Sequence, residues 1–172
     1  MAGKARIVES SRPSATSMPV PDKMLELDGN ESFVELPPHV FDGLTEATVE
    51  GWVKWDKFQT HSRFFDINVR AGWWHLRNVG VRPALNMSLV GTDGGERIIC
   101  PRIVPIGEWI HLAATITADS RRLYVNGALV GERTENGDAP ELCAVERAVV
   151  GRRWREAVRT QEPGVDWRAV VG

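Results

Sequence analysis

The chain has 172 residues, enough for one domain with a sizeable hydrophobic core. Apolar residues make up 42% and charged residues 26%, and 21 Lys and Arg stand against 23 Asp and Glu, a net charge of −2. These values exclude a disordered chain and a strongly basic nucleic-acid-binding protein, and two cysteines, Cys100 and Cys143, are too few for a disulfide scaffold.

Residues 1–23 form the first segment of the chain. They hold four Pro or Gly residues and four Ser residues without apolar periodicity, which predicts a flexible leader. They lack the apolar stretch of about 7–15 residues that a secretory signal needs. No run in the chain approaches the roughly 18 apolar residues of a membrane helix. We therefore expect no membrane insertion and, by default, a cytoplasmic location.

The region after the leader predicts an all-β domain. Apolar runs at residues 24–27 and 32–36 flank the turn residues Asp28, Gly29 and Asn30 and predict a first pair of strands. Short runs of this kind, divided by turn residues about every ten positions, are typical of a β-sandwich. Further strands are expected at residues 47–55, 63–69, 73–79, 84–90, 97–100, 109–117 and 145–151.

The run from residue 47 to residue 55 alternates strictly between two kinds of side chain. Val49 and Val53 lie on one predicted face, and Glu50 and Trp52 lie on the other. One face therefore belongs to the core, and the other meets solvent or a ligand. In residues 109–117 the side chains expected to share a face are Ile110, Leu112, Ala114 and Ile116.

Asn126 and Gly127 predict a tight hairpin. Both central residues of a two-residue type I′ turn need positive φ, and Asn and Gly tolerate that conformation best. The turn fixes the register of the strands that it joins. The expected pairs are Val125 with Ala128, Tyr124 with Leu129, and Leu123 with Val130.

Five motifs follow one another along residues 24–152: LELDGNESFVELP, LTEATVEGWVKW, IGEWIHLAATI, RLYVNGALVG and AVVGR. In this order they resemble the laminin G-like jelly roll of the concanavalin A-like superfamily, in particular bacterial modules attached to other domains. The resemblance implies an antiparallel two-sheet jelly-roll β-sandwich, with one concave sheet. The expected organisation is an irregular leader at 1–23, the sandwich at 24–151 and a basic tail at 152–172.

The tail departs from the family pattern. The family usually carries a motif of the type Asp-Gly-x-Ile-Asp-Glu-Val-Arg in a last strand that lies beside the first. The corresponding stretch here, GRRWREAVRTQEPGVDWRAVVG, lacks it. Residues 164–171 are one candidate for a degenerate substitute. The alternatives are a truncated or altered end, which leaves an open edge beside residues 25–27 for another chain or domain to pair with.

A catalytic reading of the first strand pair is disfavoured. Related laminarinase-type glycoside hydrolases carry a Glu-x-Asp-x-x-Glu signature, which Glu26, Asp28 and Glu31 match. Retaining hydrolysis needs two carboxyl groups about 5–5.5 Å apart on one strand face, but Asp28 begins a turn, so Glu31 points away on the returning strand. The scattered residues His39, His61, His75 and His111 form no catalytic or metal-binding spacing. No catalytic residue is predicted.

Glycan binding on this architecture requires aromatic rings and planar polar groups on a sheet face or rim. Two clusters meet this description, one in residues 50–52 and one in residues 73–77. Neighbours in a strand point to opposite faces, so one of Trp73 and Trp74 faces outward. The alternative is that these tryptophans only fill a thin core. The predicted ligand-binding residues are Trp52, Glu50, Trp73, Trp74, His75 and Arg77.

Calcium is a further option that the resemblance allows, with the metal site itself unknown. Asp66, Asp93, Asp119 and Asp138 supply oxygen atoms near expected loops or strand ends, but no dense carboxylate loop occurs. The Arg-rich segment at residues 152–159 is read as a solvated charged stretch, because nothing at the level of the fold supports nucleic-acid binding.

The preferred hypothesis is a non-catalytic recognition module that binds a glycan or a protein surface as part of a larger assembly or multidomain protein. Its alternatives are a laminarinase-type glycoside hydrolase and a structural domain that docks, or associates with itself, through an open edge strand. Residues 24–151 hold 12 Lys and Arg against 18 Asp and Glu, so the sandwich is acidic and its flanks are basic. An acidic sandwich disfavours nucleic acid and leaves polar glycans or calcium as ligands.

Overall fold

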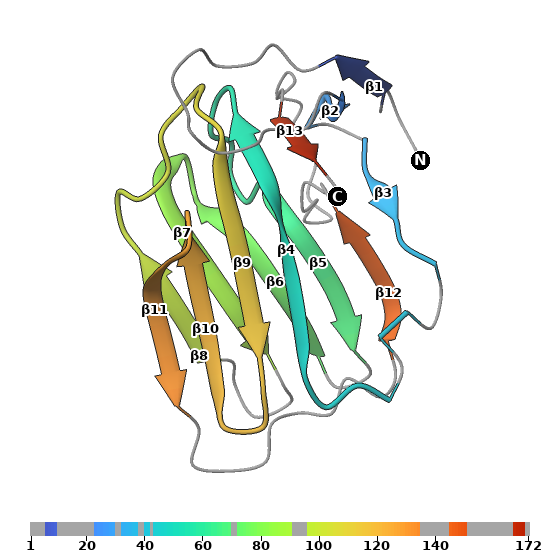
Figure 1. The fold of residues 1–172 in the computed structure, drawn as a ribbon, viewed down its shortest axis with the longest axis vertical. Helices are drawn as coiled ribbons and strands as arrows, with labels where there is room; N and C mark the ends of the chain where they lie inside the picture. Colours follow the sequence, from blue (N-terminus) through green and yellow to red (C-terminus); the bar gives the residue numbers. More distant parts are fainter. Residues whose placement is uncertain are drawn as a thin grey trace.

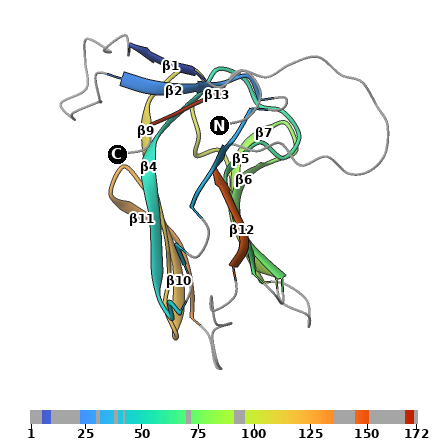
Figure 2. The same ribbon diagram turned by 90° about the vertical axis from the view of Figure 1, so that its right-hand side faces the viewer.

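The computed structural model of the chain describes residues 6–9, 23–29, 32–37, 40–41, 43–69, 72–90, 96–134, 145–150 and 167–170. All regular structure in these residues is β, and they form two sheets that face one another (Figures 1 and 2). No helix in the described segments is long and apolar enough to cross a membrane. The predicted all-β, two-sheet jelly-roll sandwich is confirmed.

The first sheet has seven strands, and the pairs along it are antiparallel. Strands distant in sequence lie side by side in it, as the jelly-roll topology requires. In spatial order its strands are β1 (Arg6–Glu9), β2 (Lys23–Leu27), β13 (Trp167–Val170), β4 (Ala47–Trp55), β9 (Ile110–Ile116), β10 (Ser120–Val125) and β11 (Ala128–Thr134).

The second sheet has six strands, also paired antiparallel. Figure 2 shows it opposite the first sheet, with β5, β6 and β12 across from β4 and β10. In spatial order its strands are β3 (Val34–Glu35), β12 (Val145–Val150), β5 (Arg63–Val69), β6 (Gly72–Val79), β7 (Arg82–Val90) and β8 (Glu96–Cys100).

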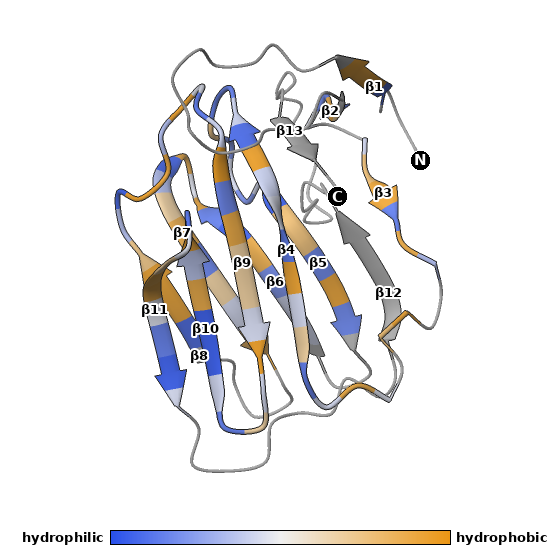
Figure 3. Cartoon of the chain, viewed as in Figure 1, coloured by the Kyte–Doolittle hydropathy of each residue, from blue (hydrophilic) through white to orange (hydrophobic). Residues whose placement is uncertain are grey.

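The period-two alternation predicted for β4 and β9 holds. Val53 is fully buried between the sheets, while Glu50 is exposed on the outward face and Trp52 lies half-buried beside it. On β9 the four residues predicted to share a face are all buried. Figure 3 shows the resulting bands of polar and apolar residues along these strands. Each sheet therefore contributes one face to the core and presents the other outward.

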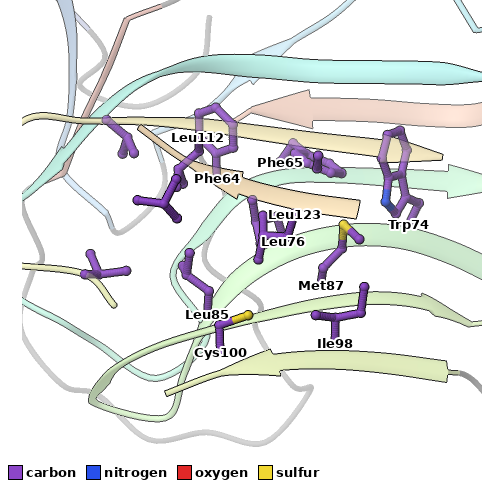
Figure 4. Packing of buried hydrophobic residues seen from close by; sticks show 14 of the residues in the cluster. Phe64, Phe65, Trp74, Leu76, Leu85, Met87, Ile98, Cys100, Leu112 and Leu123 are labelled. Carbon is purple, nitrogen blue, oxygen red and sulfur yellow. The ribbon is translucent and has the colours of Figure 1, made fainter. Parts of the chain in front are cut away.

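The core fills the space between the two sheets. Trp55 from one sheet and Trp74 from the other are fully buried, and the ring centroids of Trp74 and Phe65 lie 4.8 Å apart at an interplanar angle of 68°. Complete burial of one large apolar side chain contributes about 1.5–3 kcal/mol. Figure 4 shows the central part of this cluster, with Phe64, Phe65, Trp74, Leu76, Leu85, Met87, Ile98, Cys100, Leu112 and Leu123 labelled.

The β10–β11 hairpin forms around the predicted turn. Asn126 and Gly127 have φ values of 50° and 79°, both positive as a type I′ turn requires. Two of the predicted strand pairs are confirmed, Val125 with Ala128 and Tyr124 with Leu129. The third is wrong, because a β-bulge shifts the register and places Leu123 opposite Gly131 instead of Val130.

The register shift places a glycine where β11 crosses close to β8. A Cβ atom added at Gly131 would contact the Ile98 side chain and lie 3.0 Å from Cys100 Sγ. Cys100 is a buried free thiol that donates to the Val130 carbonyl at 3.3 Å, and burial raises its pKa. The other cysteine, Cys143, lies outside the described residues. The two sheets therefore meet at this edge through main chain and small groups.

Strand β2 pairs with a strand from near each end of the chain, one on either side. Strand β1 pairs with β2 on one side, although the sequence predicted a flexible leader there, and the rest of that leader lies outside the described residues. On the other side β13, formed by Trp167–Val170, pairs with both β2 and β4. Residues 167–170, which lie within the candidate segment 164–171, thus supply the missing strand, and the alternative of an open edge beside residues 25–27 is wrong.

Candidate functional site

The predicted ligand-binding residues divide between the two outward faces of the sandwich. Glu50 and Trp52 lie on the outer side of β4 in the first sheet, whereas Trp73 lies on β6 in the second sheet and is 44% exposed. Trp74 is fully buried in the core, so the expectation that one of the two neighbours faces outward is confirmed. The prediction that Trp74 binds the ligand is wrong, because a core side chain is inaccessible to a ligand.

We call the outward surface of β4, β9 and β10 the Trp52 face. Strand pairing aligns its side chains in rows across the sheet, since residues in register on neighbouring strands project to the same side. The rows are Thr48 with Thr115 and Arg122, Glu50 with Ala113 and Tyr124, and Trp52 with His111.

His111 holds Trp52 and Glu50 together at one end of this face. Its ring meets the Trp52 indole edge to face, with centroids 5.4 Å apart, and its Nε2 lies 3.9 Å from a carboxylate oxygen of Glu50. The main-chain N–H of His111 donates to Asn126 Oδ1 at 2.8 Å, which ties β9 to the hairpin turn. The three side chains form one aromatic and polar group.

A shallow, open depression lies at the other end of the Trp52 face. It has a volume of about 350 Å³ and contains hydroxyl, carboxylate and guanidinium groups. Glu132 accepts a hydrogen bond from Arg122 Nε at 2.6 Å; this bond and the charge of Glu132 raise the pKa of Arg122 and fix its orientation. The lining residues are Glu46, Ala47, Thr48, Thr115, Ile116, Thr117, Arg122 and Tyr124.

A small second core supports the Trp52 face from the side of the chain ends. Met24 and Trp109 are buried there, and Val8 and Trp52 pack against them. Lys54 Nζ lies 5.9 Å from the centroid of the Trp109 ring. Sequence reasoning missed this cluster because Val8 belongs to the predicted leader, and the short apolar pair Ile-Val at residues 7–8 was the only local signal.

We call the outward surface of β5, β6, β7 and β8 the His75 face. Its central row brings together Asp66, His75, Ser88 and Arg97 in register. A neighbouring row begins with Arg63 opposite Arg77. Much of this polar surface is nevertheless buried: Arg63, Asp66, Asn86 and Ser88 belong to the buried residues, and the side chain of His75 is only 3% exposed.

The electrostatics of the His75 face are dominated by cations. Arg63 Nη1 forms a buried ion pair with Asp66 Oδ2, and Arg77 Nη1 contacts His61 Nδ1. Burial, followed by the positive charges of the nearby arginines, lowers the pKa of His75 to about 3. Burial and the same arginines also lower the pKa of His61. Both imidazoles are therefore neutral at physiological pH.

A family model matches most of the chain. A laminin G-type family model described as the concanavalin A-like lectin/glucanases superfamily matches residues 28–162. The chain belongs to this superfamily. The resemblance of the five sequence motifs is thereby confirmed. The search of curated proteins found no match.

Solved structures of this superfamily's sandwich type are similar to the chain at low sequence identity. The CBM40 of the Ruminococcus gnavus IT-sialidase, bound to α2,3 sialyllactose, has a TM-score of 0.64 at 12% identity over 86% of this chain and 89% of that one. Domain 4 of a GH43 arabinanase from Geobacillus stearothermophilus, in complex with arabinotriose, has a TM-score of 0.61 at 19% identity over 96% and 81%.

A third similar structure is the binding domain of botulinum neurotoxin serotype G, with a TM-score of 0.62 at 11% identity. The match covers 96% of this chain but 42% of that one, so the chain spans less than half of the toxin domain. At these identities the comparisons establish the fold. They also show that the neighbouring structures include carbohydrate-binding and receptor-binding domains.

The superfamily includes both lectins and glucanases, so the carboxylates of the first strand pair matter. Glu26 is buried on β2 and forms an ion pair with Arg6 at 2.7 Å. Asp28 Oδ1 accepts a hydrogen bond from the main-chain N–H of Ser32 at 3.1 Å and so stabilises the turn. Glu31 lies outside the described residues. The two described carboxylates are thus engaged in holding the fold.

The residues suggested for calcium do not come together in the described part of the chain. Asp66 pairs with Arg63, and Asp119 is exposed in the turn between β9 and β10. Asp93 and Asp138 lie outside the described residues. No group of three or more His, Cys, Asp or Glu side chains that could hold a metal ion occurs among the described residues. Calcium binding stays an untested prediction.

Proposed function

We propose that the protein is a non-catalytic recognition module that binds a glycan along the Trp52 face. The observation that carries this proposal is the alignment of aromatic and hydrogen-bonding side chains on three adjacent strands, with Trp52 and His111 at one end and the depression beside Tyr124 at the other. An aromatic ring packs against the apolar face of a sugar, and planar polar groups bind its hydroxyls.

The dimensions of the Trp52 face suit an oligosaccharide. Thr48 and Trp52 are four residues apart on β4, which corresponds to about 13 Å along an extended strand. The hydroxyl groups of Thr48 and Thr115 and the guanidinium of Arg122 line the depression at the end remote from Trp52. A ligand with several sugar units can therefore contact the ring and the polar groups at the same time.

The charge balance of the Trp52 face favours an uncharged glycan. Arg122 is paired with Glu132, and Glu50 lies beside the imidazole of His111, so these two charged groups already have polar neighbours. A neutral sugar adds hydrogen bonds to such pairs without leaving a new charge unbalanced. We therefore infer that the ligand of this face is a neutral oligosaccharide.

A binding role is favoured over hydrolysis by the roles of the carboxylates. Hydrolysis with retention requires two carboxyl groups about 5–5.5 Å apart at the scissile bond. Glu26 is held by Arg6, and Asp28 holds its own turn, so neither is available for that chemistry. Two similar structures were solved with glycans bound, one acidic and one neutral, which supports a glycan in general as the ligand.

A glycan is also favoured over a protein surface. Protein-binding patches are centred on large apolar side chains in a dry core. Trp52 is half-buried beside the imidazole of His111 and the carboxylate of Glu50, and hydroxyl and guanidinium groups line the depression at the other end of the face. This composition is typical of a polar ligand held by several hydrogen bonds.

A glycan array followed by calorimetry tests the proposal. The array carries neutral oligosaccharides, arabinotriose among them, and the best neutral ligand is titrated into the wild type and three variants. We expect Trp52→Ala to weaken binding at least tenfold, Trp52→Phe to retain most of it, and Trp73→Ala, the matched aromatic control on the opposite face, to leave it within twofold.

Because Trp52 also packs in the second core, an exposed residue provides a second variant. Arg122→Gln removes the guanidinium from the depression, and we expect it to weaken binding severalfold with unchanged thermal unfolding. If no neutral glycan binds, or if Trp73→Ala weakens binding as much as Trp52→Ala, the proposal is wrong. Release of reducing ends from the ligand would contradict its non-catalytic part.

A further inference from the structure

His75 is a buried imidazole without a hydrogen-bond partner among the described residues. Its side chain is 3% exposed, and neither ring nitrogen has a partner in the described part of the chain. A buried polar group left in this state costs about 1–3 kcal/mol. Nearly all such groups in native proteins are satisfied by protein, water or ligand, so His75 calls for a partner that the described residues do not supply.

The surroundings of His75 are positively charged. Arg63 and Arg77 lie directly opposite one another on β5 and β6, an arrangement of like charges that destabilises a sheet. Arg97 lies on β8, two strands from β6, in the same cross-strand row as His75. All three arginines, in addition to burial, lower the pKa of His75.

The described carboxylates do not balance these charges. Asp66 is in register with His75, and its Oδ2 is bound by Arg63. Arg77 contacts the neutral ring of His61, and its Nε has no hydrogen-bond partner in the described residues. Arg97 forms no ion pair with any described residue and is exposed. The charge of Asp66 also acts on Arg77, so one carboxylate serves both Arg63 and Arg77, and Arg97 has no acidic partner among the described residues.

A bound anion removes two costs: the unsatisfied hydrogen-bonding groups of His75 and the repulsion between the positive charges around it. Guanidinium groups bind carboxylate or sulfate oxygens through paired, charge-assisted hydrogen bonds. A neutral imidazole still carries one N–H, so His75 donates to the same anion from beneath. The negative charge also reduces the repulsion between Arg63 and Arg77.

We propose that the His75 face is a second binding site, which takes the carboxylate or sulfate group of an acidic glycan between Arg77 and Arg97, with His75 as a buried donor and Trp73 as the stacking surface. This site lies on the sheet opposite the Trp52 face and uses none of its residues. It is independent of the neutral-glycan site proposed above.

Trp73 is the reason to assign a sugar and not an acidic peptide. It projects from β6 on the same side as His75, two residues before it, and 44% of its surface is exposed. Two residues on a strand span about 6.7 Å, roughly one sugar ring, so a ring stacked on Trp73 carries its acidic substituent toward the arginines. Asn68, opposite Trp73 on β5, offers an amide to the same ring.

Protonation couples to binding at this site. The groups that face His75 are Arg63 and Asp66 on β5, Arg77 on β6, Arg97 on β8 and His61 in the preceding loop, with Glu35 at the edge on β3. An anion among them favours the charged imidazole and raises the pKa of His75 from its value in the free protein. Binding of an acidic glycan therefore strengthens as the pH falls from 7.5 to 5.

The test uses calorimetry with three defined probes: trigalacturonate, which carries carboxylates, a chondroitin sulfate tetrasaccharide, which also carries sulfates, and neutral maltotriose. We expect one or both acidic probes to bind, at least threefold more tightly at pH 5 than at pH 7.5 and more weakly at high salt. Binding of trigalacturonate assigns a carboxylate, and binding of the sulfated probe alone assigns a sulfate. Equal affinity for maltotriose overturns the proposal.

Variants locate the site. We expect Arg97→Gln and Arg77→Gln each to weaken binding of the acidic probe at least tenfold, and Trp73→Ala to weaken it about fivefold. Arg133→Gln removes the same charge from an exposed position on β11 of the other sheet and should change affinity less than twofold. Equal losses for Arg97→Gln and Arg133→Gln overturn the proposal, because they reveal a non-specific charge effect.

Two controls separate this proposal from folding defects and from the neutral-glycan site. Arg97 is exposed, so Arg97→Gln remains informative if the half-buried Arg77→Gln fails to fold. Trp52→Ala should bind the acidic probe as the wild type does, and a loss there moves the site to the other face. A hexaglutamate peptide that binds as tightly as the acidic glycan contradicts the assignment to a sugar.

Discussion

On the Trp52 face two charged groups have polar neighbours in contact with water: Glu132 accepts a hydrogen bond from Arg122, and Glu50 lies beside His111. On the His75 face the arginines are crowded around one buried imidazole, and Asp66, the carboxylate in register with that imidazole, pairs with Arg63. Both faces are the outward sides of sheets with the same alternation. The difference lies in burial and charge balance.

This difference shows how one sandwich presents two kinds of surface. A strand projects every second side chain outward whatever its chemistry, so the fold alone does not determine what a face recognises. A balanced, exposed face is suited to an uncharged ligand that adds hydrogen bonds. A buried, cationic face is stable only when an anion or a shifted protonation state relieves it.

The largest expected effect separates the two neighbouring tryptophans of β6. Trp74→Ala should lower the free energy of unfolding by about 3–5 kcal/mol, since it removes a fully buried ring from the core. Trp73→Ala, its matched control on the outward face, should cost less than about 1 kcal/mol. Urea denaturation measures both. Similar losses for the two variants would contradict the assignment of Trp73 to the surface.

The second prediction concerns acid stability on the His75 face. His75 has a pKa of about 3 in the folded protein and about 6.5 in the unfolded chain, so between these values the unfolded chain binds the additional proton. The free energy of unfolding is therefore not reduced by His75 above pH 6.5, and it decreases as the pH falls toward 3. We expect a loss on the order of 3 kcal/mol between pH 7 and pH 4.

Urea denaturation of the wild type and His75→Asn at pH 7, 5 and 4 isolates this contribution. The variant should lack that part of the pH dependence, because its amide does not titrate. A wild type and a variant with parallel stability curves would show that His75 protonates freely, and the buried, cationic description of this face would then fail.

The third prediction concerns the edge where the two sheets meet. Gly131→Ala should destabilise the protein by about 1–3 kcal/mol, because its Cβ would contact the Ile98 and Cys100 side chains. In an Ile98→Ala background the cost should fall, since the main obstacle is removed. Thermal unfolding of the four proteins completes the cycle. Additive effects of the two changes would contradict the close approach of β11 to β8.

The smallest expected effect lies at the side of the Trp52 face. Lys54→Met removes the charge above Trp109 and keeps most of the methylene packing, and it should cost about 0.5–1 kcal/mol. Lys57→Met, an exposed change in the loop after β4, serves as the matched control and should be neutral. Equal losses of stability for Lys54→Met and Lys57→Met would contradict a stabilising contact between Lys54 and the Trp109 ring.

Much of the fold followed from the sequence because local rules governed it. Strict alternation placed Val53 inside and Trp52 outside, and the Asn126 and Gly127 turn fixed the first two pairs of its hairpin. The bulge beside Gly131 was not predictable, because it lies where β11 passes close to β8, a strand that is distant in sequence. Likewise β1 was missed, and β13 was only one of the alternatives for the last strand, because both are short and weakly patterned without their partner β2.

Local strand alternation also predicted part of the candidate sites. Alternation showed that Trp73 and Trp74 face opposite ways, but which of them enters the core depends on the register with β5 and β7. The sequence placed Arg77 near His75, whereas the approach of Arg63 and Arg97 arises only from strand pairing. Residues on different strands meet through topology, which one sequence does not reveal.

The most direct test of the central claim is an amide chemical-shift titration of the protein with the neutral glycan selected on the array. We expect the shift changes to concentrate on β4, β9 and β10 around Trp52, His111 and Tyr124, while the amides of β6 and β7 are unaffected. Changes centred on β6 around His75, or no changes at all, would contradict glycan recognition by the Trp52 face.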